Sequence, residues 1–206
     1  MKRILVYCEG PSEETFVNRI IAPAFYEKEI YFTASSCNGV SKYSIIKKQL
    51  QEYCRHDRTQ YVTMMVDYYG LHGDVPGIHD HVSGDIYTKI THIEKAIQDD
   101  IKETNFIPNL ILHEFEALLF SQPEYFDYCD ISHQTVEQLC HIASDFATPE
   151  HINNAPNTAP SKRILALYPA YNKILDGYAI AELIGLSTIR KKCKHFDAWL
   201  TTLELL

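Results

Sequence analysis

The stretch LVYCEGPSEETF, residues 5–16, joins a short apolar run directly to a cluster of acidic residues. The apolar run, residues 4–8, is typical of a strand that is buried on both faces of a parallel sheet. Ser12 is expected to cap the helix that follows. Nucleotide-binding proteins carry glycines and a lysine at such a strand-to-helix turn, whereas this chain carries Glu9 and Glu13. These acids favour a cation as the first ligand, with a phosphate bound through it.

Buried strands and amphipathic helices continue to alternate through the first 120 residues. We expect further strands at 30–34, 61–66 and 107–112, and helices from Ser12 to about Pro23, at 41–56 and at 85–103. This alternation implies right-handed crossovers and a parallel sheet that is covered on both faces. After residue 120 the pattern is helical. We therefore predict an α/β fold, with a four-stranded parallel sheet between helices over residues 1–120 and a C-terminal helical extension over residues 121–206 that packs on this core.

The composition is ordinary for a soluble globular protein, with 46% hydrophobic and 22% charged residues in a chain of 206. The net charge of -8 argues against binding nucleic acid by charge alone, so any such contact must be local or helped by a partner. The six cysteines form no C-x-x-C pair, which argues against a zinc knuckle or a redox dithiol. No apolar stretch approaches the ~18 residues of a membrane span and no signal peptide is recognisable, so we expect a cytoplasmic protein without membrane contact.

Acidic residues follow three of the four expected strands. Glu9 follows the first strand, Asp67 the third, and Glu114 and Glu116 the fourth. In an open parallel sheet the carboxyl ends of the strands form the ligand crevice, and Glu13 in the first helical turn tilts back toward it. Gathered carboxylates raise one another's pKa values, and a divalent cation relieves this conflict. Because Mg²⁺ and Mn²⁺ prefer oxygen ligands, we predict a Mg²⁺ or Mn²⁺ site at this edge of the sheet.

Each of these acids also has a purely structural explanation. Glu13 can complement the helix dipole, Glu9 can be a solvated loop carboxylate, and Asp67 can be an ordinary turn residue. The cation site is therefore favoured by the conjunction of acids at three strand ends, and no single acid carries the prediction.

The tetrad HEFE, residues 113–116, contributes a histidine and two acids. The segment after it looks helical, and two residues two positions apart on a helix point in different directions. Only one of the two acids is therefore expected to reach the metal, and we favour Glu116 with Glu114 as the alternative. His113 is interpreted as a ligand, a general base or a group that orients a ligand, with a buried structural histidine as the other reading.

The residues around these acids resemble the Toprim domain, the metal-binding catalytic module of topoisomerases, bacterial primases and nucleases related to the overcoming-lysogenization-defect proteins. More closely, the segments CEGPSEETF (8–16), VDYYG (66–70) and HEFEALLF (113–120) look like a bacterial domain-of-unknown-function family, the 4276 family, that is related to the Toprim nucleases. The Toprim-like part covers about residues 1–120. The resemblance implies a compact four-stranded parallel sheet between helices.

The same resemblance implies roles for individual residues. Glu9 would be a metal ligand or general acid–base group, and Asp67 a metal ligand. Toprim nucleases often carry a second aspartate two residues later, and Tyr69 stands there, which leaves a one-metal or inactive site open. Such nucleases also use a lysine from a later element, for which Lys162, at the start of an expected helix, is the candidate, with a plain surface lysine as the alternative. An ATPase partner is implied because members of these families are often fused to, or encoded beside, an ATPase.

The leading functional hypothesis is a divalent-metal-dependent nuclease that hydrolyses phosphodiester bonds of DNA or RNA. It would be a subunit of a bacterial anti-phage defence system that works with an ATPase. One alternative is a non-catalytic adaptor of that ATPase, motivated by Tyr69, and another is a phosphohydrolase or phosphoacceptor domain in which Asp67 takes the phosphoryl group. The basic run at residues 190–195 is a candidate local contact with nucleic acid or a solvated helix face. Assembly into a homo-oligomer stays open.

Overall fold

A computed structural model describes residues 1–37, 39, 42–71, 73–152 and 156–206, which divide into two compact units. The first unit contains residues 1–111 and Leu206, and the second contains residues 112–205. The described part of the first unit is built on a parallel sheet, and that of the second is built from helices. Among the described residues, no helix combines the length and the apolar character that crossing a membrane requires.

The sheet of the first unit is parallel and has the strand order β2-β1-β3-β4. The predicted α/β fold with a parallel sheet and a helical C-terminal region is thereby confirmed. The central strand β1 buries Ile4, Val6 and Cys8 completely, as its apolar sequence predicted. The strands are β1 (Lys2–Cys8), β2 (Ile30–Ser36), β3 (Tyr61–Asp67), β4 (Phe106–Ile107) and β5 (Leu110–Ile111).

The predicted fourth strand is divided into two short strands, so the sheet has five strands where four were expected. β4 and β5 both pair with β3, at Val62–Thr63 and at Val66–Asp67 respectively. Pro108 lies between them and has no N–H to donate to a ladder. The buried Asn109 supplies a donor instead, because its Nδ2 donates a hydrogen bond to the Met64 carbonyl at 3.1 Å.

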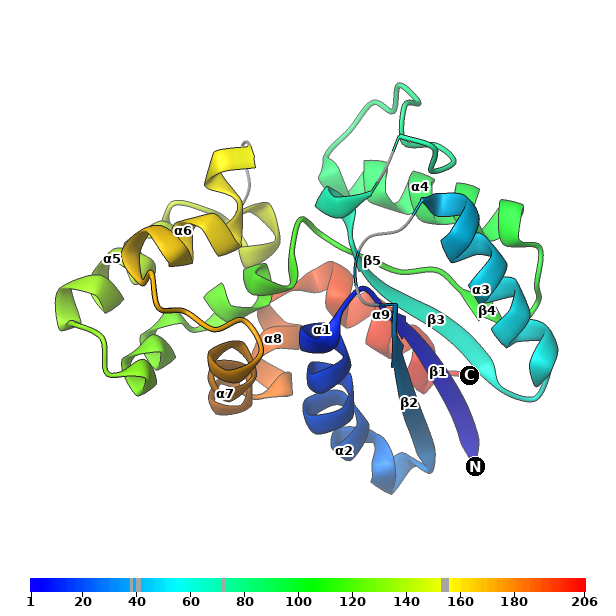
Figure 1. Ribbon diagram of the computed structural model, residues 1–206, viewed down its shortest axis with the longest axis horizontal. Coiled ribbons are helices and arrows are strands. Elements are labelled where there is room, and N and C mark those ends of the chain that lie inside the picture. The colour runs from blue at the N-terminus through cyan, green and yellow to red at the C-terminus, as the bar shows by residue number, and fades with distance from the viewer. Residues whose placement is uncertain (38, 40–41, 72, 153–155) are drawn as a thin grey trace. The chain divides into compact units, whose positions relative to one another are not determined.

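Helices cover both faces of this sheet, with α1 and α2 on one side and α3 and α4 on the other (Figure 1). The prediction that the first helix ends near Pro23 is wrong. Pro23 lies in the first turn of α2, a position that tolerates a residue without an N–H, and the helical course continues to Lys28. The elements are α1 (Pro11–Phe16), η1 (Val17–Ile21, a π-helix), α2 (Ala22–Phe25), η2 (Tyr26–Lys28), α3 (Tyr43–His56), η3 (Tyr68–Gly70) and α4 (Ile86–Ile101).

The second unit packs short helices around an apolar core of its own. Phe115, Leu119, Ile180 and Leu200 are among its buried side chains, each at most 1% exposed. Burial of this kind is the main source of stability for short helices. The elements are η4 (Phe115–Ser121), η5 (Pro123–Cys129), α5 (His133–Ser144), η6 (Pro149–His151), η7 (Pro156–Thr158), α6 (Pro160–Leu167), α7 (Leu175–Ile184), α8 (Leu186–Lys192) and α9 (Lys194–Glu204).

A buried carboxylate marks the start of α9. Glu150, in η6, is only 3% exposed. Its Oε1 accepts a hydrogen bond from the Phe196 N–H at 3.0 Å, and its Oε2 accepts one from the His195 N–H at 3.2 Å. Because the first N–H groups of a helix lack partners within the helix and carry partial positive charge, this acid ties η6 to the beginning of α9.

The basic run at residues 190–195 is not a uniformly solvated surface. Arg190 forms ion pairs with two acids of α9, Asp197 and Glu204, and its Nη1 lies 2.6 Å from Glu204 Oε1. Half-buried pairs of this kind hold α8 against α9. Arg190 therefore has a structural role, whereas Lys191, Lys192 and Lys194 of this run are exposed.

Candidate functional site

The first group of candidate residues lies at the carboxyl ends of two neighbouring strands of the first unit. Glu9 directly follows β1, and Asp67 is the last residue of β3. The Asp67 N–H donates a hydrogen bond to Glu9 Oε2 at 3.2 Å, while the Glu9 N–H donates to the Met65 carbonyl. Asp67 is 5% exposed and Glu9 is half-buried. The structure thus brings the Glu9 carboxylate against the backbone of Asp67 at two neighbouring strand ends, while the role of the two residues as metal ligands stays a prediction.

Glu13 lies in the first turn of α1 and is buried. Its Oε2 accepts a hydrogen bond from the Gly10 N–H at 3.0 Å. The helix begins two residues earlier than predicted, since Gly10 is its N-cap and Ser12 lies inside the first turn. The physical reason is Pro11, whose fixed φ suits the first helical position. Glu13 therefore holds the turn that carries Glu9, whether or not it also binds a metal.

The second group of candidates belongs to the second unit and begins with Glu114 and Lys162. Glu114 precedes η4, and its Oε2 accepts a hydrogen bond from the Ser161 N–H at 2.8 Å. Ser161 lies in the first turn of α6, directly before Lys162, whose side chain is exposed. The structure thus brings Glu114 to the segment that carries Lys162. Their roles as a metal ligand and a phosphate contact stay predictions.

Glu116 is completely buried, and its Oε2 lies 3.4 Å from the Nζ of Lys173. A buried carboxylate needs hydrogen-bond donors, a cation or a metal to offset its lost hydration, and Lys173 is such a cation for Glu116. The nearby Tyr171 has its pKa raised by burial and then by the negative charge of Glu116. Lys173 lies in a connection between helices and belongs to no recognisable motif, so its role could not be read from the sequence.

His113 precedes this group and has an unusual backbone conformation. Its φ is 67°, in the left-handed region that disfavours a residue with a Cβ. Its side chain is 8% exposed, and burial, followed by the charge of His151, lowers its pKa to about 4. The imidazole is therefore neutral near pH 7, which suits a proton acceptor as well as a structural side chain.

We expect the His113→Ala variant to be less stable than the His113→Gly variant by about 1 kcal/mol. Both variants lose the imidazole, but only alanine retains a Cβ at the positive φ. Urea unfolding of the two variants, compared side by side, measures the difference. Equal stabilities, or a less stable glycine variant, would show that the left-handed conformation is not held at this position.

The oxygen donors of Glu9 and Asp67 suit a hard divalent cation, since Mg²⁺ is commonly held by one or two carboxylates together with water. Tyr69, which stands where Toprim nucleases often have a second aspartate, lies in η3 with 40% of its surface exposed. No cluster of three or more His, Cys, Asp or Glu side chains suited to a metal is found in the part of the chain that the structure describes. Metal binding by Glu9 and Asp67 therefore stays a prediction.

Comparison with known proteins gives one family and remote structural likenesses. The family model described as "Domain of unknown function (DUF4276)" matches residues 8–204. The C-terminal region of the Burkholderia pseudomallei OLD protein is 15% identical, with 95% of this chain and 98% of that chain covered and a TM-score of 0.49. That of the Xanthomonas campestris pv. campestris OLD protein is 15% identical, with 98% of both chains covered and a TM-score of 0.46. No curated protein matches the chain.

Proposed function

The chain belongs to the DUF4276 family, and we propose that it is a divalent-metal-dependent nuclease that hydrolyses phosphodiester bonds of DNA or RNA. The observation that carries this proposal is the hydrogen bond between the Asp67 N–H and Glu9 Oε2, which joins two carboxylate residues at adjacent strand ends. Ligands of open parallel sheets bind at this edge. The resemblance of the surrounding motifs to Toprim nucleases supports the same reaction. We further propose that the protein works with an ATPase subunit in bacterial anti-phage defence.

In this proposal Glu9 and Asp67 hold Mg²⁺ or Mn²⁺ through carboxylate oxygens. The bound ion supplies positive charge that polarises the phosphodiester. The Asp67 N–H fixes one oxygen of Glu9, and Glu13 fixes the turn at Gly10, so the Glu9 carboxylate is oriented before the substrate binds. Little reorganisation is then needed during the reaction.

The second unit carries the remaining candidates. Lys162 would stabilise the negative charge that develops on the phosphate, and the neutral imidazole of His113 would accept a proton from the attacking water. Glu114 and Glu116 stay the candidate carboxylate ligands of this unit. Glu116 would have to exchange Lys173 for the metal, whereas Glu114 would have to exchange only a backbone N–H.

We expect the Asp67→Asn variant to bind Mn²⁺ at least ~10-fold more weakly than wild type, because it loses a charged ligand but keeps its size and its backbone N–H. Calorimetric titration of the full chain with Mn²⁺ measures this. Asp99→Asn, which alters an exposed acid paired only with Lys95, is the matched control and should bind like wild type. Wild type should cleave single-stranded DNA, double-stranded DNA or RNA with Mg²⁺ or Mn²⁺ and lose this activity in EDTA. Unchanged Mn²⁺ affinity, or cleavage in EDTA, would contradict the proposal.

The exposed Tyr69 favours a second candidate function, a non-catalytic adaptor of the ATPase. A tyrosine at this position supplies no carboxylate for a second metal. This adaptor would co-purify with an ATPase and cleave no nucleic acid with either metal. The cleavage assay on wild type therefore separates the two candidates.

A further inference from the structure

A pocket of about 470 Å³ opens within the second unit. It is formed by the end of η4, the start of η5, the C-terminal part of α5, the segment that follows α5, and one face of α8. This volume is in the range of small-molecule sites and is large enough for a base, a sugar and a phosphate. None of the catalytic or metal candidates discussed above lines it.

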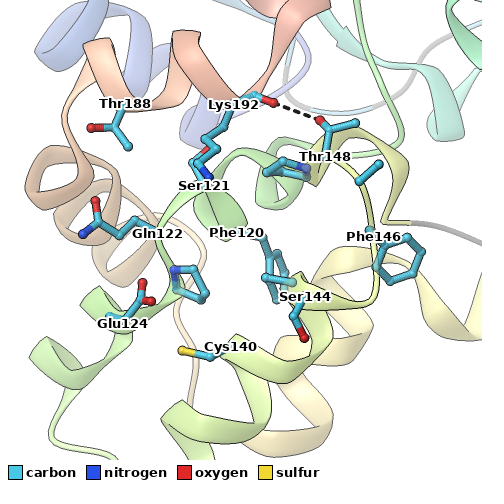
Figure 2. A pocket seen from close by; sticks show the side chains of 14 residues that line it. Phe120, Ser121, Gln122, Glu124, Cys140, Ser144, Phe146, Thr148, Thr188 and Lys192 are labelled. Atoms are coloured by element: carbon cyan, nitrogen blue, oxygen red, sulfur yellow. Dashed lines mark hydrogen bonds between the residues drawn. The ribbon is translucent and has the colours of Figure 1, made fainter.

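The apolar part of the pocket combines the rings of Phe120 and Phe146 with proline and alanine side chains, and Phe120 is only 2% exposed. Phe120 lies near the middle of the view in Figure 2, between Gln122 and Glu124 on one side and Phe146 on the other. The Phe146 ring is also stacked by Arg163, whose guanidinium carbon lies 5.3 Å from the ring centroid. Aromatic faces of this kind bind nucleobases by stacking and tolerate any base.

The polar part of the pocket falls into two sets. The hydroxyl groups of Ser121, Ser144 and Thr148 already make hydrogen bonds within the protein, the last of them to the Lys192 carbonyl at 2.9 Å (Figure 2). Across the described residues, four other lining side chains make no hydrogen bond or ion pair and remain available to a ligand. These are Gln122, Glu124, Thr188 and Lys192.

These four side chains differ in charge and in their position within the pocket. Thr188 and Lys192 are four residues apart on α8 and therefore share one face, where an ammonium and a hydroxyl can bind a phosphate. Gln122 and Glu124 come from the start of η5. A carboxylate repels phosphate but accepts hydrogen bonds from the amino group of a base, and the amide of Gln122 can both donate to and accept from a base edge.

We propose that this pocket binds a nucleoside monophosphate whose base carries an amino group, either as a free nucleotide or as the end of a nucleic-acid strand. Lys192 and Thr188 bind the phosphate, the half-exposed ring of Phe146 packs against the base, and Glu124 accepts a hydrogen bond from the amino group. The inference goes beyond the proposed nuclease activity and does not depend on it, because nucleotide binding is measured without cleavage.

The test is calorimetric titration of the full chain with AMP, GMP and CMP, and with IMP and UMP as counterparts that lack the amino group. At least one amino-bearing nucleotide should bind ~10-fold more tightly than its counterpart, because a site built to bond an N–H group rejects the analogue without it. Lys192→Ala should weaken binding of that nucleotide at least ~10-fold. Lys191→Ala, which changes an adjacent exposed lysine outside the pocket, should leave binding unchanged.

Two further variants test whether a loss of nucleotide binding is specific to this pocket. Glu124→Ala, which removes the acceptor from an exposed position, should abolish the preference for the amino-bearing base while phosphate binding persists. Ala147→Trp should block the pocket from an exposed position without disturbing the core. A 5′-phosphorylated tetranucleotide that displaces the bound nucleotide assigns the site to a strand end, and failure to displace it assigns the site to free nucleotides. No binding of any nucleotide by wild type, equal affinity for both classes of base, or full binding by Lys192→Ala overturns the proposal.

Discussion

The Glu9→Gln variant is expected to cleave nucleic acid ~10³-fold more slowly than wild type at saturating Mn²⁺. Glutamine keeps the length of the side chain and an oxygen that can accept the Asp67 N–H, so the local structure is retained. It removes the negative charge, which both metal binding and proton transfer require. Single-turnover cleavage rates measured across a Mn²⁺ titration separate a loss of metal affinity from a loss of chemistry.

The matched control for this experiment is Glu14→Gln. Glu14 is the next acid along α1 and, like Glu13, lies in its first turn, so both variants remove one negative charge from the same segment. We expect the control to cleave at the wild-type rate, and both variants to unfold within ~0.5 kcal/mol of wild type, as is usual for changes that break no buried contact. Near-normal cleavage by Glu9→Gln would place the metal-dependent reaction outside this pair of strand ends.

The two strands that carry this site could be predicted because a strand that is buried on both faces has a continuous apolar sequence. The run before Glu9 and the run before Asp67 both become strands, although β1 begins two residues earlier than the pattern indicated and β3 ends one residue later. Acids at the carboxyl ends of adjacent parallel strands then lie near one another, irrespective of the conformation of the loops. The position of Glu9 beside Asp67 is therefore a consequence of topology, which local sequence can specify.

The break in the fourth strand and the start of the first helix each depend on a single proline. The apolar pattern alone did not predict either of them. Pro108 interrupts the run from 107 to 112, and a proline inside a strand pattern is itself a signal of a break. Pro11 likewise moves the helix start from Ser12 to Gly10. Both features could have been predicted from the prolines, since a residue without an N–H is favoured where the backbone needs no N–H donor.

The contacts of the second unit could not be predicted in this way. Lys173 meets Glu116 only because the connection between α6 and α7 reaches η4, and no spacing rule links these residues. Glu114 accepts a hydrogen bond from the backbone N–H of Ser161. Every residue except proline has a backbone N–H, so the residue type at position 161 does not predict the contact. The same holds for Glu150, whose carboxylate accepts hydrogen bonds from the backbone N–H groups of His195 and Phe196.

Replacing Glu150 by alanine is expected to lower the free energy of unfolding by about 3 kcal/mol, because two hydrogen bonds to a buried charged group are lost and two N–H groups of α9 lose their acceptor. Urea unfolding followed by circular dichroism measures the loss. Glu137→Ala is the matched control, because Glu137 is an exposed acid of α5, with 66% of its side chain accessible, paired only with His133. It should cost less than ~0.5 kcal/mol.

The Glu150→Gln variant tests whether the negative charge and the second acceptor oxygen of Glu150 contribute to stability. Glutamine retains one oxygen that can accept a hydrogen bond, but its amide nitrogen donates and would face a helix N-terminus that offers only donors. It also removes the charge that complements the dipole of α9. We therefore expect its stability to fall between those of wild type and Glu150→Ala. If glutamine were tolerated at no cost, the carboxylate would act as a simple space-filling group, and the link between η6 and α9 would have to come from the apolar contacts around Phe196 and Leu200 alone.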